Sequence, residues 1–278
     1  MTNYINEKLL SINDVRAVTW QIDKDLAESA VPSDLTENGA KFGSLQTALI
    51  VASRYPTTKI TINVLIGPHP LNVSISNANL SHVYITGSAG TSNVTGSLTL
   101  FNVTLGSIDK VNFFGGCFLT NVNILSENSM YFADLELNNC KLQFSVLAAD
   151  SIIIDNSSSL VVNRTFDIQP QEKGEAIAKV NNNSSLILRG SNNTISNGYL
   201  VVSNNSSAVI SQLETSERLA AVNYSQIYAP SNITFAAETI VIAKNSSYIE
   251  LDKDATGDIK YYPAPGTIDY SQSQIKLV

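Results

Sequence analysis

The chain of 278 residues has few charges, few cysteines and few histidines. Charged side chains make up 15% of it, well below the ~25% of an ordinary globular domain. Cys117, Cys140, His69 and His82 are too scattered to form a metal site, and we expect neither a metal nor a cofactor. No apolar run reaches the ~18 residues that would predict a transmembrane helix. The formal charge of −7, without any basic run, argues against nucleic acid or an anionic membrane as a partner.

The polar part of the composition is dominated by Asn, Ser and Thr, which keep the surface soluble in place of charges. Hydrophobic residues make up 44% of the chain, enough for the core of one elongated domain. This balance is typical of a β-solenoid and argues against a helical enzyme. Residues 1–7 lack the basic and then apolar pattern of a secretory signal peptide, so no export signal is expected there.

A short repeat is the strongest pattern in the sequence. A six-residue pattern occurs at 100–105, 119–124 and 137–142. Its first and last positions are apolar, its third is Asn, its fourth is Val or Cys, and its second and fifth vary. Residues 80–85 keep the apolar positions without the asparagine, which gives steps of 18 to 20 residues between starts. Such a step is too short for a pair of helices and suits one coil of a solenoid built from short strands. Asn102, Asn121 and Asn139 would then form a row.

A second repeat follows the same logic with Asn and Ser at its centre. It occupies residues 154–162, 180–188, 202–210 and 242–250, with a degenerate copy at 222–227. Asn tolerates left-handed backbone angles and Ser caps nearby amides, so each centre is predicted to be a corner between two strands. The stretches 166–175 and 213–219 interrupt this repeat and are interpreted as protruding loops.

The corners create many Asn-x-Ser/Thr triplets, at Asn93, Asn102, Asn183, Asn205, Asn232 and Asn245. N-glycosylation of a secreted protein is one interpretation. Because the triplets fall largely within the repeat, we favour turn and ladder chemistry instead.

Two cysteines lie in the repeat region. Cys140 takes the place of Val122 in the aligned repeat, so we interpret Cys117 and Cys140 as buried small side chains. A disulfide between them is the alternative.

Residues 8–29 are predicted to form a helix capped at Ser11 or Asn13. An imperfect heptad seam could join copies of the chain, most simply three, and its candidate oligomerisation residues are Ile12, Val15, Trp20, Ile22 and Leu26. A helix packed on its own domain is a second interpretation. A third takes Val18, Trp20 and Ile22 as one face of a short strand.

The next segment is predicted to be a helix that covers the open end of the solenoid. Ser44 is a natural N-cap, and Pro56 stops the helix. Leu45, Ala48, Leu49 and Ala52 make one apolar face. Residues 59–66 and 71–75 then alternate as strands around a turn at 67–70.

Residues 42–49, 60–67, 71–75 and 83–87 together resemble the opening of pectin-lyase-like right-handed parallel β-helices, in particular those of bacteriophage tailspike and tail-fibre proteins. The resemblance is concentrated in residues 42–90 and covers about 40–250 as architecture. It implies an all-β, single-stranded right-handed parallel β-helix with an N-terminal helical segment and a capping helix. The expected divisions are an attachment segment at 1–40, the β-helix at 41–252 and a closing segment at 253–278.

The same resemblance implies a homotrimer on the tail of a virion. Its N-terminal segment would bind other tail or baseplate proteins, and the protein would act outside the cell in attachment to the host surface, with surface polysaccharide as a potential ligand. A bacterial surface adhesin is a further alternative.

Enzymatic activity is not the expectation. A pectinesterase has tyrosine and glutamate after the turn glycine, whereas residues 68–71 of this chain contain neither tyrosine nor glutamate. No segment resembles the catalytic aspartate motifs of pectinesterases or the calcium-binding acidic cluster of pectate lyases. A polysaccharide depolymerase on the same fold remains the alternative. Its best local candidates are Asp134 and Glu136, two apart on a predicted strand, with Tyr131 placed to stack on a sugar ring.

Overall fold

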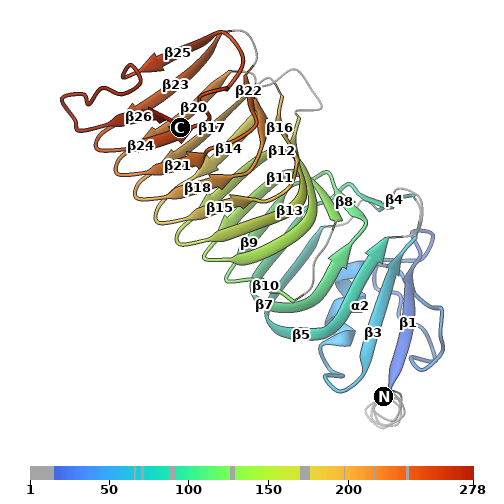
Figure 1. The fold of residues 1–278 in the computed structure, drawn as a ribbon. Coiled ribbons are helices and arrows are strands. Elements are labelled where there is room, and N and C mark those ends of the chain that lie inside the picture. The colour runs from blue at the N-terminus through green and yellow to red at the C-terminus, as the bar shows by residue number, and fades with distance from the viewer. Residues whose placement is uncertain are drawn as a thin grey trace. The chain divides into compact units, whose positions relative to one another are not determined.

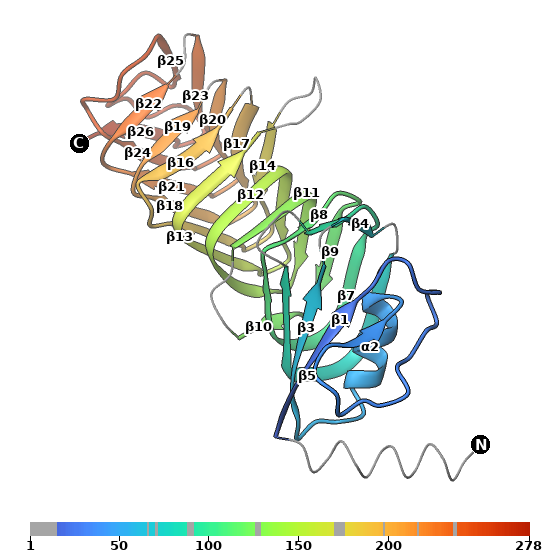
Figure 2. The same cartoon turned by 90° about the vertical axis from the view of Figure 1, so that its right-hand side faces the viewer.

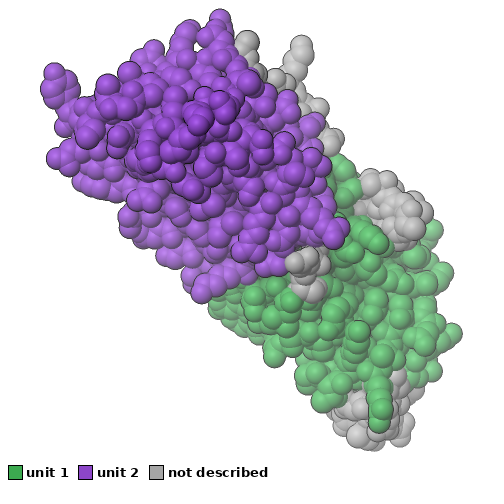
Figure 3. Space-filling view, in the orientation of Figure 1, with its two compact units in different colours: residues 1–132 green, residues 133–278 purple. Residues whose placement is uncertain are grey.

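The computed structural model describes residues 16–65, 67–69, 72–87, 92–125, 129–169, 176–196, 198–215, 217–235 and 238–278. The chain divides into two compact units, residues 1–132 and 133–278 (Figure 3). Each unit is a parallel β-solenoid, in which successive coils pair strand upon strand (Figure 1), and this confirms the predicted fold class. In the described ranges, no helix has the length and apolarity needed to cross a bilayer.

Unit 1 contains one described helix and eleven strands, the last of which runs across the boundary between the units. The elements are β1 (Ala17–Ile22), β2 (Ala40–Phe42), α2 (Leu45–Ala52), β3 (Lys59–Val64), β4 (Gly67–His69), β5 (Val73–Gly87), β6 (Ser92–Val94), β7 (Leu98–Asp109), β8 (Val111–Phe113), β9 (Cys117–Thr120), β10 (Asn123–Ile124) and β11 (Ser129–Asn138).

The prediction of a helix over residues 8–29 is wrong for its described part. Residues 17–22 form strand β1, which pairs in parallel with β3 along its whole length and with β2 (Figure 2). Val18, Trp20 and Ile22 face the core, as the strand interpretation requires. Alternation with a period of two therefore outweighs the weak heptad, in which the polar Thr19 occupies a seam position. The proposed caps Ser11 and Asn13 lie outside the described residues.

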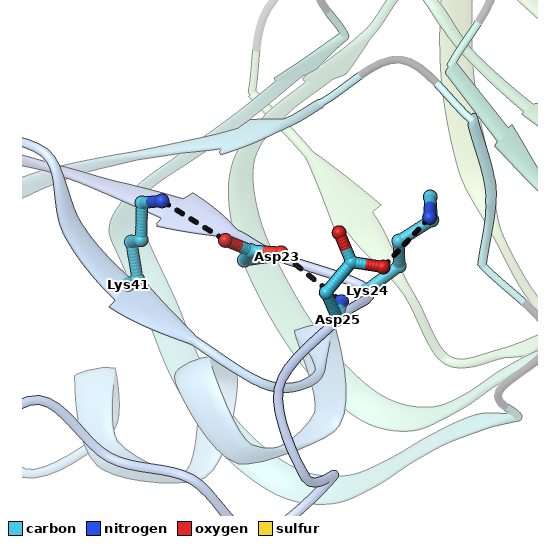
Figure 4. A network of polar contacts seen from close by, with 4 residues as sticks. All are labelled: Asp23, Lys24, Asp25 and Lys41. Atoms are coloured by element: carbon cyan, nitrogen blue, oxygen red, sulfur yellow. Dashed lines mark hydrogen bonds and ion pairs between the residues drawn. The ribbon is translucent and has the colours of Figure 1, made fainter.

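Trp20 is a core residue of unit 1. Its side chain is 0% exposed, its ring lies 4.7 Å from that of Phe42, and its indole Nε1 donates a hydrogen bond to the carbonyl of Leu35 at 3.0 Å. The turn that follows β1 is closed by charged side chains (Figure 4). The Asp23 carboxylate accepts from the Asp25 backbone amide and from Lys41 Nζ, both at 3.0 Å, and these two bonds lower the pKa of Asp23.

The capping helix is present as predicted. Helix α2 begins after Ser44, whose hydroxyl accepts from the Thr47 amide, and it buries Leu45, Ala48, Leu49 and Ala52. At the edge of β5, the side chain of Gln46 makes the hydrogen bonds that a neighbouring strand would otherwise make. Its amide donates to the Ser74 carbonyl at 2.8 Å and accepts from the Ser74 amide at 2.6 Å. The helix thus satisfies part of a sheet edge that would otherwise be open.

The register of unit 1 corrects one copy of the repeat. Ile75 lies beside Leu100 and Leu80 beside Leu105, so the copy that precedes 100–105 is 75–80 and not 80–85. This copy carries Asn77 at the asparagine position. Residues 67–69, predicted as part of a turn, form the short strand β4 against β6.

Unit 2 begins inside β11 and continues through fifteen further strands. They are β12 (Lys141–Asp155), β13 (Ser159–Ile168), β14 (Ala176–Val180), β15 (Ser185–Leu188), β16 (Asn192–Ile195), β17 (Gly198–Ser203), β18 (Ser207–Ile210), β19 (Leu213–Thr215), β20 (Arg218–Val222), β21 (Gln226–Ala229), β22 (Ile233–Phe235), β23 (Thr239–Lys244), β24 (Tyr248–Leu251), β25 (Ile259–Tyr262) and β26 (Gln274–Leu277).

These strands stack into three faces, which we call first, second and third in chain order within a coil. The first face contains the end of β12 and strands β14, β17, β20, β23 and β25. The second contains the starts of β12 and β13 and strands β15, β18, β21, β24 and β26. The third contains the middle of β12, the end of β13 and strands β16, β19 and β22. The loops predicted at 166–175 and 213–219 are wrong for most of their described parts: residues 166–168 belong to β13, 213–215 to β19 and 218–219 to β20, whereas residues 170–175 and 216 lie outside the described ranges.

The corner between the first and second faces confirms the Asn-Ser-Ser interpretation. Two consecutive residues adopt positive φ in each coil, at 156–157, 182–183, 204–205, 223–224 and 245–246. Asparagine amides bond from coil to coil, for example Asn204 Nδ2 to Asn182 Oδ1 at 3.0 Å and Asn223 Nδ2 to Asn204 Oδ1 at 2.9 Å. Unit 1 has a matching row, in which Asn121 donates to Asn102 at 2.7 Å and Asn102 to Asn77 at 2.9 Å.

Ladder chemistry therefore explains the glycosylation triplets at these positions. The amide nitrogen to which a glycan would be attached donates a hydrogen bond in Asn102, Asn205 and Asn245. Cys117 and Cys140 are both free and buried, as predicted, each within the core of its own unit.

A buried row of serines lies just inside the same corner of unit 2. Its members are Ser158, Ser184, Ser206, Ser225, Ser247 and Ser273. The amide of each of the first five donates to the hydroxyl of the serine in the next coil, at 3.1–3.3 Å. Cys140 starts the row by donating its amide to the Ser158 hydroxyl at 3.0 Å. The hydroxyls thus satisfy backbone donors that are shielded from water.

We expect Ser225→Ala to lower the free energy of unfolding by about 1–3 kcal/mol, because the buried Ser206 amide would lose its acceptor. Chemical denaturation followed by circular dichroism measures the change. Ser207→Ala is the matched control: this serine points outward and should change stability by no more than ~0.5 kcal/mol. Equal effects of the two substitutions would contradict a specific role for the buried row.

We expect Trp20→Ala to destabilise unit 1 by about 3–5 kcal/mol, because it empties a core site and leaves the Leu35 carbonyl unpaired. The wild-type emission maximum should be that of a buried indole at every protein concentration and should shift to the red on unfolding. Emission typical of an exposed indole in dilute folded protein would instead place Trp20 in a contact between copies.

Candidate functional site

The candidate acids Asp134 and Glu136 lie on an open outer surface of unit 2. Both side chains are exposed, and they alternate with the buried Leu135 and Leu137 along β11. The strand rise places them about 7 Å apart, within the range used by inverting glycosidases. The Ser151 hydroxyl donates to Asp134. A general acid needs an apolar, enclosed surrounding, which these exposed side chains do not have.

Tyr131, the candidate for carbohydrate stacking, belongs to unit 1. It lies opposite Asn112 of β8, and its ring is 5.1 Å from Phe114 at an angle of 44°. Tyr131 is partly buried and Phe114 is 38% exposed, so the two rings form a small aromatic pair with one ring open to solvent.

The candidate oligomerisation residues do not form one surface. Trp20 and Ile22 are buried in the core of unit 1, whereas Leu26 is 39% exposed in the turn after β1. Ile12 and Val15 lie outside the described residues. Residues 17–22 therefore have a folding role in β1, and Leu26 is the one described candidate that presents apolar area at the surface.

Two phenylalanines that the sequence reasoning missed are the most exposed aromatic side chains on the strands of unit 1. Phe101 on β7 and Phe118 on β9 are each 45% exposed. Phe118 of β9 lies beside Thr99 of β7. Phe101 follows Thr99 by two residues on β7 and lies beside Thr120 of β9. With neighbouring strands ~4.8 Å apart and a rise of ~3.3 Å per residue, the two rings start from positions about 8 Å apart on one face.

The rest of this face carries hydroxyl groups. Ser74 lies beside Thr99, and Ser76 lies beside Phe101. We call the outward side chains of Ser74, Ser76, Thr99, Phe101, Phe118 and Thr120 the aromatic surface. Flat apolar rings among hydroxyl donors and acceptors complement a sugar ring, which has apolar C–H faces and a hydroxyl rim.

A groove adjoins the aromatic surface where helix α2 meets β5. Its volume is about 240 Å³, and it is lined by Gln46, Leu49, Ile50, Ser53, Ser74, Ile75, Ser76 and Ala78. Ser74 and Ser76 belong both to the groove and to the aromatic surface. Ile50 is 43% exposed and adds apolar area on the helix side. The hydroxyl and apolar groups thus extend continuously over two neighbouring elements of unit 1.

A polar cluster on the second face of unit 2 also groups titratable side chains. The Tyr248 hydroxyl donates to Glu250 at 2.6 Å, and Lys276 Nζ approaches the same carboxylate at 3.5 Å. Desolvation, with smaller contributions from Glu250, raises the pKa of Tyr248 to about 12. A phenol held so firmly in its neutral form donates hydrogen bonds and is a poor general base at neutral pH.

Within the described ranges, no three His, Cys, Asp or Glu side chains gather closely enough to hold a metal ion. No family model matches the chain, and neither the curated proteins nor the solved structures contain a significant match. The parallel β-solenoid is therefore the level at which the chain is classified, and the function has to be inferred from its surfaces.

Proposed function

We propose that the protein is a structural, non-enzymatic component of a bacteriophage tail fibre or tailspike that engages carbohydrate on the host surface through the aromatic surface of unit 1. The observation that carries the proposal is the pair of exposed phenylalanines on a sheet face whose other outward side chains are hydroxyls. The resemblance of residues 42–90 to the opening of pectin-lyase-like β-helices supports the choice of protein class.

The scaffold is better suited to binding a glycan than to hydrolysing one. Parallel ladders hold the strands of the aromatic surface at fixed spacing, and helix α2 fixes the edge of β5 through Gln46. A preorganised surface binds without paying for ordering of its side chains. The exposed acids Asp134 and Glu136 lack the enclosure that glycoside hydrolysis needs.

We expect Phe101→Ala and Phe118→Ala each to weaken binding to the recognised glycan by about tenfold or more, because each removes a stacking surface. Immobilised bacterial capsular polysaccharides and lipopolysaccharides, read by biolayer interferometry, provide the measurement. Tyr270→Ala is the matched control, since Tyr270 is a fully exposed aromatic residue in unit 2 and should leave binding unchanged. Undiminished binding by the Phe101→Ala/Phe118→Ala double variant, or no binding by the parent protein, would reject the proposed site.

The virion assignment has a separate test. Antibodies raised against the purified protein should label the tails of virions made by the source strain when these are viewed by negative-stain electron microscopy. Label confined to the bacterial surface would favour the adhesin alternative instead.

A polysaccharide depolymerase is the second candidate, supported by the ~7 Å separation of Asp134 and Glu136. It requires release of reducing ends from host polysaccharide, and this release should fall by orders of magnitude in Asp134→Asn or Glu136→Gln. The structural proposal instead expects no release above the level of a heat-denatured sample, for the parent and for both variants alike.

A further inference from the structure

The edge of β5 beside helix α2 presents backbone hydrogen-bonding groups to the groove (Figure 2). The Val73 amide donates to the Ser97 carbonyl at 2.8 Å, so Val73 and Ile75 turn their backbone groups toward β7. Ser74 and Ser76 alternate with them and turn their N–H and C=O groups the other way, toward α2. In the described ranges, no strand pairs with this edge of β5 at residues 73–76.

At Ser74 a side-chain amide already occupies this edge. Gln46 donates to the Ser74 carbonyl at 2.8 Å and accepts from its N–H at 2.6 Å, as the peptide groups of a neighbouring strand would. Ser76 is exposed and presents the same pair of backbone groups two residues further along, at the groove. Among the described side chains, none takes this second position. The edge therefore offers a second place for an amide.

The asparagine row of unit 1 ends at the same edge. Each Nδ2 of the row donates toward the preceding coil, from Asn121 to Asn102 and from Asn102 to Asn77. Asn77 belongs to the earliest coil of this row, so by the same geometry its own Nδ2 is directed toward the edge that faces α2. It is exposed and directly follows Ser76. A backbone donor and a side-chain donor thus both await an acceptor at the groove.

The wall of the groove that α2 provides is largely apolar. Leu49 and Ile50 line it, with Ile50 43% exposed, and Ala78 of β5 lies across from them. Ser53 is the polar group of this wall. Its hydroxyl donates to the Ile50 carbonyl at 2.8 Å, which leaves its oxygen able to accept a hydrogen bond. The described residues that line the groove include no charged side chain, so the groove suits a neutral group.

We propose that the groove binds the acetamido group of an N-acetylated sugar while that sugar stacks on Phe101. The acetamido carbonyl accepts from the Ser76 N–H, its N–H donates to Ser53 Oγ, and its methyl group packs on Ile50. A trans amide directs its C=O and N–H to opposite sides, so one acetamido group bridges the β5 and α2 walls. Phe101 lies beside Ser76, one strand spacing of ~4.8 Å away, which places both contacts within one sugar.

Size and charge favour this group over other ligands. The volume of about 240 Å³ is below the ~300–1,000 Å³ of sites that enclose a drug-sized ligand, so the groove takes a substituent and not a peptide strand. A hydroxyl in the same place would leave the apolar wall uncovered, and a carboxylate would lose water without gaining a cation. The inference rests on the proposed carbohydrate binding and specifies the class of glycan that is bound.

Three matched pairs of sugars provide the test. N-acetylglucosamine and glucose, N-acetylgalactosamine and galactose, and N-acetylmannosamine and mannose are each measured against the full chain by saturation-transfer difference NMR. In at least one pair the N-acetylated sugar should bind about tenfold or more tightly than its partner, with the strongest signal on its acetamido methyl protons.

The outcomes separate this inference from the proposed function. Equal binding within all three pairs, or no signal from any N-acetylated sugar, would overturn the acetamido site while polysaccharide binding lost in the Phe101→Ala/Phe118→Ala variant would still support the aromatic surface. No binding by any sugar or any polysaccharide would remove both proposals.

Two variants test the groove itself. Ile50→Glu places a carboxylate against the acetamido methyl group and should abolish the preference for the N-acetylated sugar. Ile268→Glu makes the same substitution at an isoleucine of unit 2 that is 68% exposed, and it should keep the preference. Ser76→Pro removes the proposed donor at an edge position where proline is tolerated, and it should weaken only the N-acetylated member of a pair. Phe101→Ala should weaken both members alike.

Circular dichroism melting verifies that each variant is folded. If Ser76→Pro does not fold, Ile50→Glu decides alone, since its side chain is exposed on the helix and glutamate is a good helix former. An undiminished preference for the N-acetylated sugar in folded Ile50→Glu would overturn the proposal.

Discussion

The corner between two faces of each coil is the constraint on which unit 2 depends. Two consecutive residues there take left-handed backbone angles, which cost a typical L-residue about 1–2 kcal/mol each. Asn reduces that cost, and the serine that follows turns its hydroxyl inward to accept an amide from the previous coil. Without this acceptor a backbone N–H would be buried and unpaired in every coil. The identical repetition of the corner keeps the faces in register.

The sequence predicts the corners well because their chemistry is local. Asn-Ser-Ser needs no distant partner to be recognised as a turn, and even the degenerate copy at Asn223, Tyr224 and Ser225 adopts the same geometry. Register is harder, since it depends on which coil lies above which. The long strand β5 contains two apolar sets, and only pairing shows that Ile75, and not Leu80, lies beside Leu100.

The N-terminal segment shows how two periods can compete in one sequence. Ile22 fits both a heptad position and an alternating strand, whereas Val18, which faces the core with it, is not on the heptad seam. Pairing with β3 decides the outcome, and a single-sequence pattern contains no information about that pairing partner. The exposed surfaces were missed for a related reason. Phe101 and Phe118 occupy outward positions of their strands, each next to an inward leucine, Leu100 or Leu119. This alternation was the sequence signal from which their exposure could have been predicted.

Inward and outward positions of a solenoid are selected by different requirements. Inward positions must fill a column, so Leu160, Leu186 and Ala208 stack at close to zero exposure whatever the outer surface does. Outward positions are free of that requirement, so their composition reflects solubility or contact. One outward row of the second face carries the hydroxyls of Ser159, Ser185 and Ser207, which satisfy solubility at no cost to folding. The other outward row of the same face holds Val161, Ile187 and Val209, and Val209 is 42% exposed, so outward composition differs from row to row within one face.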